Sequence, residues 1–317
     1  MEETMDQPIT RREAIRKGLI ISGSVLLAGT LGRPDLKSPV ALAEQKKGGF
    51  VVEGVGKAEG YSVAELTKRV FDAAGGMQQF VSKGDVVVVK PNISWARAPN
   101  LAATTNPEVL EAVIKLAFNA GAKKVRIVDN TIHDARRCFA LSGAGMVAKK
   151  TGADLIYPRS SLMRDMKIQG HRLDVWPVFT PVIEADKVIN IPVAKVHTLS
   201  KLTLGMKNWI GGVGGRRNAL HQDIHQTIVD LAQFFKPSVT LIDAIRVMVK
   251  NGPSGGSESD VAVMNRLILS NDPVAADAKG AGLFQIPPQS IGFILLAEKR
   301  GLGTSDLTKL NQQQVIL

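Results

Sequence analysis

The stretch that decides the fold is residues 190–217, which read NIPVAKVHTLSKLTLGMKNWIGGVGGRR. Its first three residues close an apolar run, 187–192, which is typical of a buried strand. Lysines, a histidine and two arginines follow that run directly, and the stretch ends in a glycine-rich turn. Open α/β sheets bind ligands at the carboxyl ends of their strands, and successive backbone N–H groups can bind anions there. The stretch therefore predicts an α/β protein with an anion site at one strand end.

The flanking sequence alternates strand-like and helix-like segments. Strands are predicted at 51–52, 86–89, 125–130, 153–157, 187–192, 239–244 and 267–269. Helices are predicted from Ser62 towards Phe80, after Asn106, at 136–152 with an interruption near Gly143, at 220–235, after Asp272 and at 293–299. This alternation favours a three-layer α/β fold, with a mostly parallel sheet and helices on both faces. A small β excursion is predicted near residues 160–180, where short alternating pieces flank Gly170.

The first 43 residues carry the pattern of an export signal. A twin-arginine pair lies within Thr10–Lys17, an uncharged run extends from Leu19 to Gly32, and Ala41-Leu42-Ala43 resembles a cleavage site. The apolar run is shorter than the about 20 residues of a spanning helix, so no stable transmembrane anchor is expected after cleavage. We predict export by the twin-arginine machinery to the periplasm or the extracellular space, with 44–317 as a single α/β domain. An uncleaved membrane anchor is the alternative.

The composition narrows the classes of ligand. The chain has a formal net charge of +11, but its basic residues are scattered and its aromatic content is 5%. Because no stacking platform or recognised nucleic-acid motif is present, no nucleic-acid partner is expected. A small anionic ligand is favoured instead. The single cysteine, Cys138, excludes an intramolecular disulfide and a cysteine-ligated iron–sulfur cluster.

An ordered set of short motifs between Val86 and Phe284 resembles a known family. The motifs are Lys90-Pro91-Asn92, Asn190-Ile191-Pro192, Lys195-x-His197, Gly205-Met206-Lys207-Asn208, His221, Asp230-Leu231, Asp243-Ala244, Asn251-Gly252-Pro253 and Asp272 to Asp277. Together they are similar to the bacterial and archaeal Domain of Unknown Function 362 family. The resemblance implies a fold and a set of motifs, but no established reaction. Some members carry ferredoxin-like cysteine clusters, which a chain with one cysteine cannot hold.

Lys195 and His197 are the candidate catalytic residues. Lys195 follows a buried strand, where desolvation lowers the pKa of a lysine and an anionic ligand restores its charge. His197 shares a face with Lys195 on extended backbone, and the adjacent amine favours the neutral imidazole of a general base. We predict that Lys195 holds the anion and His197 moves a proton. The alternatives are a lysine that snorkels at the sheet edge and a histidine that bonds a carbonyl.

Polar side chains at other strand ends and turns are predicted to bind the same anion. They are Lys90, Asn92, Lys207, Asn208, Arg216 and Asp243. The glycine-rich segment 211–217 is expected either to wrap N–H groups around an oxyanion or to form a mobile surface loop. Segment 251–256 is a second candidate lid. No nucleotide site is predicted, because the G-K-[ST] ending of a P-loop is missing.

A metal site is predicted from His221 and His225, which stand four residues apart in the expected helix 220–235. This spacing places two side chains on one helix face. Two histidines leave a divalent metal short of ligands, so Asp223, Asp243 or His197 would have to complete the site. Exposed or packed histidines are the alternative.

These residues predict an enzyme that transfers a proton on a small carboxylate or phosphate. The activity would be isomerase- or racemase-like, or an oxidoreductase activity assisted by a metal or redox cofactor. The alternative from another class is a non-catalytic periplasmic protein that binds an anion or a metal. Nucleic-acid binding, a third alternative, predicts a steep salt dependence.

Overall fold

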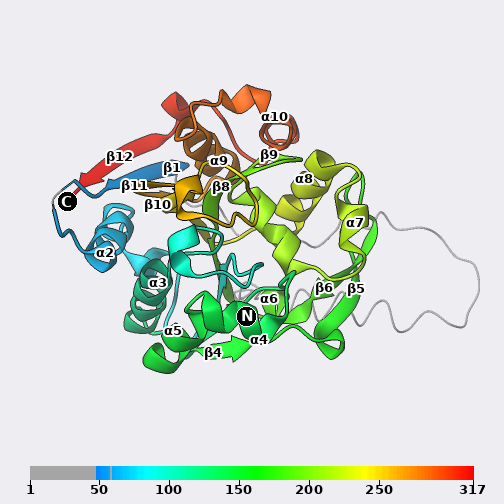
Figure 1. Cartoon of the computed structure of the whole chain (residues 1–317), viewed down its shortest axis with the longest axis horizontal. Helices are drawn as coiled ribbons and strands as arrows, with labels where there is room; N and C mark the ends of the chain where they lie inside the picture. The colour runs from blue at the N-terminus through cyan, green and yellow to red at the C-terminus, as the bar shows by residue number, and fades with distance from the viewer. Residues whose placement is uncertain (1–47, 58) are drawn as a thin grey trace, which may run out of the picture.

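A ten-stranded sheet lies at the centre of the computed structural model, which describes residues 48–57 and 59–317 (Figure 1). Its strands are β1 (Phe50–Val55), β2 (Val86–Pro91), β3 (Lys124–Val128), β4 (Asp154–Ile156), β7 (Lys187–Ile191), β8 (Val193–His197), β9 (Lys201–Thr203), β10 (Val239–Met248), β11 (Val261–Ser270) and β12 (Asn311–Ile316). The predicted export signal lies outside the described residues. In the part of the chain that is described, no helix has the length and apolar character to span a bilayer.

The sheet is mostly parallel, as predicted. Its main path runs β12-β1-β11-β10-β7-β2-β3-β4, and β8 and β9 join it through β10. Parallel pairs join β1 to β12, β2 to β3 and β7, β3 to β4, and β10 to β7 and β8. Antiparallel pairs join β11 to β1 and β10, and β8 to β9. The predicted β excursion is a separate hairpin of β5 (Met163–Lys167) and β6 (Val175–Phe179).

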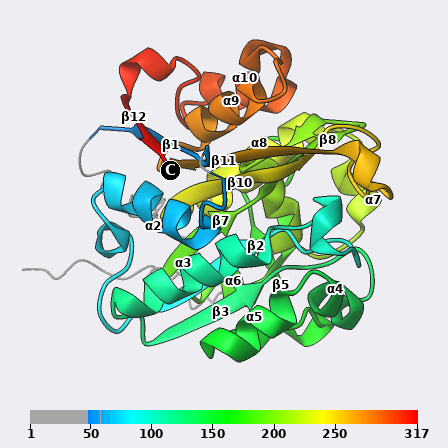
Figure 2. The same ribbon diagram turned by 60° about the vertical axis from the view of Figure 1, so that its left-hand side comes forward.

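Helices cover both faces of the sheet. They are α2 (Val63–Ala73), α3 (Pro107–Asn119), α4 (Ala135–Leu141), α5 (Ala144–Thr151), α6 (Thr180–Ile183), α7 (Arg217–Leu220), α8 (Ile224–Phe235), α9 (Pro273–Gly282) and α10 (Gly292–Lys299). Strand β2 shows how the layers form: Val87 and Val89 belong to the apolar cluster under α2, α3 and α5, whereas Val88 belongs to the cluster under α8, α9 and α10. Figure 2 shows α2 and α3 on one side of the strands and α9 and α10 on the other.

Short polar signals fix the ends of the helices. The Ser62 side chain accepts a hydrogen bond from Glu65 N at 3.2 Å, and Asn106 accepts one from Glu108 N at 2.9 Å, so both predicted N-caps are confirmed. Helix α2 ends at Ala73 rather than near Phe80. The reason is the pair Gly75–Gly76, whose φ angles of 90° and 88° lie in the left-handed region that a helix cannot continue through.

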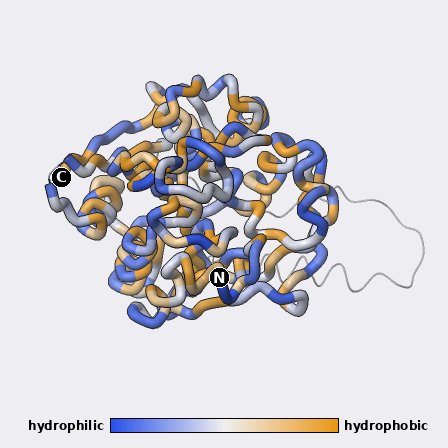
Figure 3. The backbone as a smooth tube through the Cα atoms, viewed as in Figure 1, coloured by the Kyte–Doolittle hydropathy of each residue, from blue (hydrophilic) through white to orange (hydrophobic). Residues whose placement is uncertain are grey.

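Two further differences from the sequence prediction are an additional strand at the edge of the sheet and a break within an expected helix. Strand β12 is hydrophilic over most of its length, NQQQVI, and lies exposed at one edge of the sheet (Figure 3). The expected helix 220–235 is broken, because α7 ends at Leu220 and α8 begins at Ile224. Asp223 caps the second helix by accepting from Gln226 N at 3.3 Å, so His221 and His225 do not share one helix.

Candidate functional site

The candidate site lies where the pairing of β2 with β7 ends and the chain continues into β8. Strands β2 and β7 pair as far as Pro91 and Ile191, and Pro192 then offers no N–H for a further ladder bond. The chain stays beside β10, because Pro192 O accepts from Asp243 N at 2.8 Å, and β8 turns to pair with β9. The Thr105 hydroxyl closes the end of the β2–β7 ladder by bonding Ile191 O at 2.7 Å. A cavity occupies the space beyond.

This cavity has a volume of about 240 Å³. It brings together six of the predicted site residues, which are Asn92, Lys195, His197, Lys207, Asn208 and His221, the last predicted as a metal ligand. Thr203 and Arg217 also line it. The convergence of residues from β8, β9, the loop after β2 and two later segments is a property of the fold, since these residues lie on separate elements.

Lys195 is a buried amine without a carboxylate partner among the described residues. Its Nζ lies 2.5 Å from Ala103 O and 3.4 Å from Asn92 Oδ1, and the residue is only 1% exposed. The pKa of Lys195 is lowered to about 7, with burial as the largest cause and the neighbouring charge of Lys207 as the second. With this pKa, the Lys195 amine is charged in about half of the ligand-free molecules near pH 7.

Lys207 is the second such amine. It comes from the 3-10 helix η4 (Met206–Gly212), which is buried throughout. Burial again lowers the pKa of Lys207 to about 7, with the Arg217 guanidinium as the second cause. Within the described residues, neither lysine nor Arg217 forms an ion pair with a carboxylate. The cavity therefore gathers three cationic side chains, and Asp129 of the buried Lys90 ion pair is the carboxylate whose charge acts on Lys195 and Arg217.

Lys90 behaves differently, and its predicted role in substrate binding does not match its position. Its Nζ donates to Asp129 Oδ1 at 2.7 Å and to Pro91 O at 2.9 Å, and both ion-pair side chains are buried. The other Asp129 oxygen accepts from Ile93 N at 2.6 Å. Lys90 does not line the cavity. Its ammonium group instead forms a buried ion pair with Asp129.

Asn92 and Asn208 line the cavity, but their amides are largely bonded to the protein. Asn92 Nδ2 donates to Asn208 Oδ1 at 3.2 Å, and Asn208 Nδ2 donates to Asn190 Oδ1 at 2.9 Å. Asn92 Oδ1 is the acceptor nearest to Lys195 Nζ after Ala103 O. The two asparagines therefore position the lysine, in addition to lining the space beside it.

Two imidazoles line the cavity with their rings nearly parallel. The ring centroids of His197 and His221 lie 6.4 Å apart, with 13° between the planes. Burial lowers the pKa of His197 to about 3, and the charges of Lys207, His221 and Lys195 act in the same direction. His197 is therefore neutral at physiological pH, as its proximity to Lys195 predicts.

Thr203 has the only buried side-chain oxygen in the cavity lining that lacks a hydrogen-bond partner in the described part of the chain. The residue is 3% exposed and lies opposite Lys195 in the β8–β9 register. A buried hydroxyl without a partner costs free energy, so such groups in native proteins are normally satisfied by solvent or a ligand. No local pattern in the sequence marks Thr203, because its position in the site depends on the β8–β9 hairpin.

The glycine-rich segment is neither a mobile surface loop nor a flexible N–H cradle in its first half. Gly211 and Gly212 are buried in η4. A Cβ on Gly211 would overlap Asp129 Oδ1 and lie 2.8 Å from Lys90 Nζ, and a Cβ on Gly212 would lie 2.7 Å from Phe235 Cζ. Glycine is needed here because η4 packs directly on the buried ion pair.

We therefore expect Gly211→Ala to destabilise the protein by about 1–3 kcal/mol, the usual cost of overpacking a buried site. Gly256→Ala is the matched control, since nothing lies within 4 Å of a Cβ at Gly256. Urea denaturation followed by circular dichroism gives both free energies of unfolding. Equal stabilities for the two variants would contradict the close packing of η4 on Lys90 and Asp129.

Two further predicted site residues lie outside the cavity lining. Arg216 is exposed, and the adjacent Arg217 lines the cavity in its place, with its guanidinium donating to Asn130 O. Asp243 is buried and accepts from Asn106 N at 2.7 Å and Ile245 N at 3.1 Å. Burial raises the pKa of Asp243 to about 6. Asp243 holds Asn106, the N-cap of α3, and does not line the cavity.

The metal prediction rested on a helix that does not form. The His225 ring stacks on Phe293, with 6.1 Å between centroids, and His225 does not line the cavity that His221 lines. In residues 48–57 and 59–317, no group of three or more His, Cys, Asp and Glu side chains has an arrangement that could hold a metal ion. The physical reason is that Asp223 starts a new helix between the two histidines.

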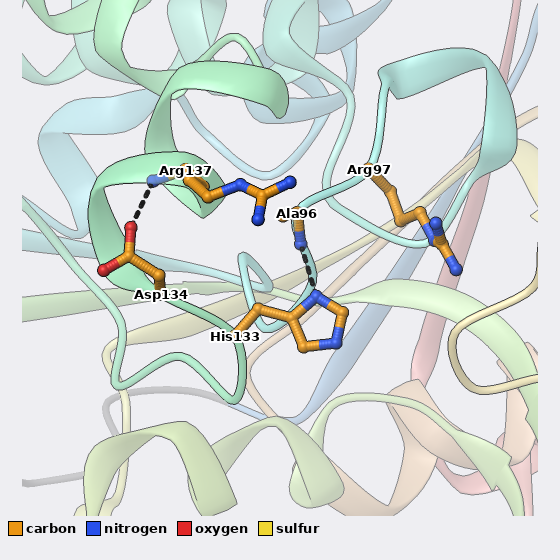
Figure 4. Close-up of a pocket in the computed structure, with 5 residues that line it drawn as sticks. All are labelled: Ala96, Arg97, His133, Asp134 and Arg137. Atoms are coloured by element: carbon orange, nitrogen blue, oxygen red, sulfur yellow. Dashed lines mark hydrogen bonds between the residues drawn. The ribbon is translucent and has the colours of Figure 1, made fainter.

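A second, shallower hollow of about 360 Å³ adjoins the cavity. It is lined by Ala96, Arg97, His133, Asp134 and Arg137 (Figure 4). The His133 ring contacts the edge of Trp95, which lines the first cavity, with centroids 4.9 Å apart. Figure 4 shows Asp134 bonded to Arg137 N and His133 bonded to Ala96 N. No motif in the sequence indicated this hollow.

The fold and site define an α/β protein with a cationic cavity at the carboxyl edge of a mostly parallel sheet. Residues 87–282, more than half of the chain, match the family described as Domain of unknown function (DUF362). The chain therefore belongs to that family, as its motifs predicted.

Known proteins similar to this chain come from several bacteria. A thylakoid-associated protein of Synechocystis sp. is 27% identical over 252 residues, which cover 77% of either chain. The lactate racemase apoprotein of Thermoanaerobacterium thermosaccharolyticum aligns with a TM-score of 0.44 and 15% identity, covering 74% of this chain and 56% of that one. A Thermotoga maritima protein aligns with a TM-score of 0.43 and 13% identity, covering 73% and 61%. This chain thus spans less than two thirds of either solved chain.

Proposed function

We propose that this protein is an exported enzyme that binds a small carboxylate or phosphate in the cavity and transfers a proton on it. The observation that carries the proposal is the convergence of Lys195, Lys207 and Arg217 on a cavity where the described residues provide no ion-paired carboxylate. Buried charges are normally paired or lose their charge. An anion would supply the missing partner and restore full charge on both amines.

The size of the cavity restricts the anion. The cavity volume of about 240 Å³ is smaller than the roughly 300–1,000 Å³ of typical small-molecule sites. This volume favours a compact acid over a larger ligand such as a nucleotide. Thr203 is the register partner of Lys195 in the β8–β9 hairpin, and its hydroxyl has no hydrogen-bond partner among the described residues. An oxyanion held there could bond both the Thr203 hydroxyl and the Lys195 amine.

Proton transfer is the reaction class that the lining supports best. Imidazole is the side chain most often used to transfer protons near neutral pH, and two imidazoles lie beside the cationic groups. Removing a proton from an atom next to a carboxylate develops negative charge, which Lys195 and Lys207 would stabilise. An isomerase- or racemase-like reaction needs no further group than these.

Binding of a simple anion is expected to weaken as the pH rises through about 7. Below that pH both lysines are charged, whereas above it the ligand-free protein must take up protons to bind, since the pKa values of Lys195 and Lys207 are about 7. Each proton taken up raises the dissociation constant by up to about tenfold per pH unit. Titration calorimetry with acetate or sulfate, whose charges stay constant between about pH 6.5 and 9, measures this slope.

Calorimetry in two buffers of different ionisation enthalpy would also count the protons taken up. Lys201→Met is a matched control, because Lys201 is exposed and outside the lining, and should keep the wild-type slope. A dissociation constant that does not change with pH, or the absence of binding at pH 6.5, would overturn the anion site.

Catalysis is tested by hydrogen exchange. The protein is incubated in D₂O with a panel of small carboxylates, and proton NMR records the loss of C–H signals. Deuterium entering a C–H bond next to the carboxylate demonstrates proton transfer without any assumed product. Binding without exchange across the panel would favour the non-catalytic binding protein instead.

A further inference from the structure

We infer that His221 Nε2 accepts the proton in this site and that His197 donates a hydrogen bond from its Nε2–H. This reverses the role that the sequence suggested for His197. The inference rests on the proposed function, proton transfer on an anion in this cavity. Beyond that function, His221 is assigned as the proton acceptor, and the bound anion must carry a group that donates a hydrogen bond or a proton to it.

Backbone contacts fix the proton of His197. Leu199 N and Ser200 N both donate to its Nδ1, at 3.1 Å and 3.4 Å. An atom that accepts hydrogen bonds carries a lone pair, so the neutral imidazole has its proton on Nε2. A proton added to Nδ1 would face two N–H groups. His197 is therefore locked as a donor at Nε2, and it cannot accept a proton or ligate a metal there in this state.

The opposite contact fixes the proton of His221. Its Nδ1 lies 2.8 Å from Arg217 O. A carbonyl oxygen only accepts hydrogen bonds, so Nδ1 carries the proton and Nε2 carries the lone pair. The contact spans the single turn of α7, from its first residue to its C-cap. A carbonyl in this position also fixes the orientation of the ring.

The two rings thus present opposite polarity to one cavity. They are nearly parallel and line the same space, and no partner for either Nε2 is found among the described residues. One offers an N–H and the other a lone pair. A guest that satisfies both must accept a hydrogen bond from His197 Nε2–H and donate one to His221 Nε2.

This complementarity narrows the substrate class. The guest is a carboxylate that has a hydroxyl, an amine or an acidic C–H on the adjoining atom. In the reaction the bond from hydrogen to that atom breaks, its electron pair stays on the substrate, and the proton forms a bond to His221 Nε2. Lys195, Lys207 and the Nε2–H of His197 stabilise the added negative charge. Return of the proton restores neutral His221, so no oxidant or reductant is consumed.

The tautomers can be measured without any substrate. Two-bond ¹H–¹⁵N NMR of ¹⁵N-histidine-labelled protein at pH 7.5 distinguishes protonated from unprotonated ring nitrogens. We expect His197 to show an unprotonated Nδ1 and His221 an unprotonated Nε2, with signals assigned from single His→Gln variants. Equal tautomers for the two residues would overturn the inference, even if anion binding and exchange were both observed.

Activity then separates the two roles. Glutamine keeps an N–H at the position of Nε2, so His197→Gln retains a donor while His221→Gln loses the base. Hydrogen exchange should fall by about 100-fold or more in His221→Gln, the usual contribution of a general base, while acetate binding persists. The loss in His197→Gln should be smaller, and His225→Gln, outside the cavity, should exchange at the wild-type rate. A larger loss in His197→Gln than in His221→Gln would reverse the assignment.

These outcomes are distinct from failure of the proposed function. If the wild-type protein binds acetate but exchanges no hydrogen, proton transfer is wrong and the NMR still decides the tautomers. If exchange occurs but both rings carry the same tautomer, the proposed function stands and the role of His221 is wrong.

Discussion

Lys195→Met is expected to weaken acetate or sulfate binding by about 30-fold or more, which corresponds to the 2 kcal/mol or more lost when one partner of a buried charge pair is removed. The same change should stabilise the ligand-free protein. Because burial lowers the pKa of Lys195 to about 7, the folded state disfavours the charged amine. Methionine has a similar volume and no charge to desolvate.

The pH dependence of this gain has a defined sign. The folded pKa of Lys195 lies below the unfolded value of about 10.4, so the unfolded chain binds more protons between pH 7 and pH 10. The penalty from the lysine is therefore complete below about pH 7 and fades as the pH rises. We expect Lys195→Met to add about 1–4 kcal/mol at pH 6.5 and little near pH 10. A Lys195→Met variant that is less stable than wild type at pH 6.5 would contradict an unpaired amine at this position.

Lys90→Met is expected to do the opposite and destabilise the protein by about 3–5 kcal/mol, the range found when one member of a buried ion pair is removed. Lys90 and Asp129 are bonded at 2.7 Å with side-chain exposures of 0% and 1%. Methionine would leave the carboxylate buried without its counter-charge. Chemical denaturation at pH 7 measures the loss.

A double variant tests the cause. Asp129→Asn removes the charge but keeps an oxygen that can accept from Ile93 N, so Lys90→Met/Asp129→Asn should recover much of the stability that Lys90→Met loses. If the double variant is no more stable than Lys90→Met, the ion pair is not the source of the loss. The opposite stability changes expected for Lys90→Met and Lys195→Met would distinguish Lys90, as a structural residue, from Lys195, as the proposed ligand-binding one.

The fold was predictable wherever a local pattern carries the physics. Val87, Val88 and Val89 alternate between two apolar clusters, which is how a strand between two helical layers must behave. Ser62 and Asn106 cap helices through contacts two or three residues away. By contrast, β12 is held by pairing with β1 across the whole chain, and its polar sequence gives no local indication of that partner.

The site was predictable in part for the same reason. Lys195, His197 and Lys207 follow a buried strand closely, so their convergence on one sheet edge could be anticipated. Lys90 occupies an equivalent position, but its partner Asp129 lies 39 residues away, and composition cannot show that its charge is already neutralised. Nor can the sequence tell which of Arg216 and Arg217 turns inward, because the start of a four-residue helix decides it: Arg216 is the extended N-cap and Arg217 the first residue of α7.

The divergence of β8 from β2 at Pro192 bears on how members of this fold can change specificity. The walls of the cavity are separated by main-chain geometry, since β7 and β2 stop pairing at Ile191 and Pro91. Pro192 has no N–H with which to extend that ladder, so the boundary is set by the main chain. Substitutions of lining side chains are therefore expected to change which chemical groups the cavity presents while the ends of β2 and β7 stay in place.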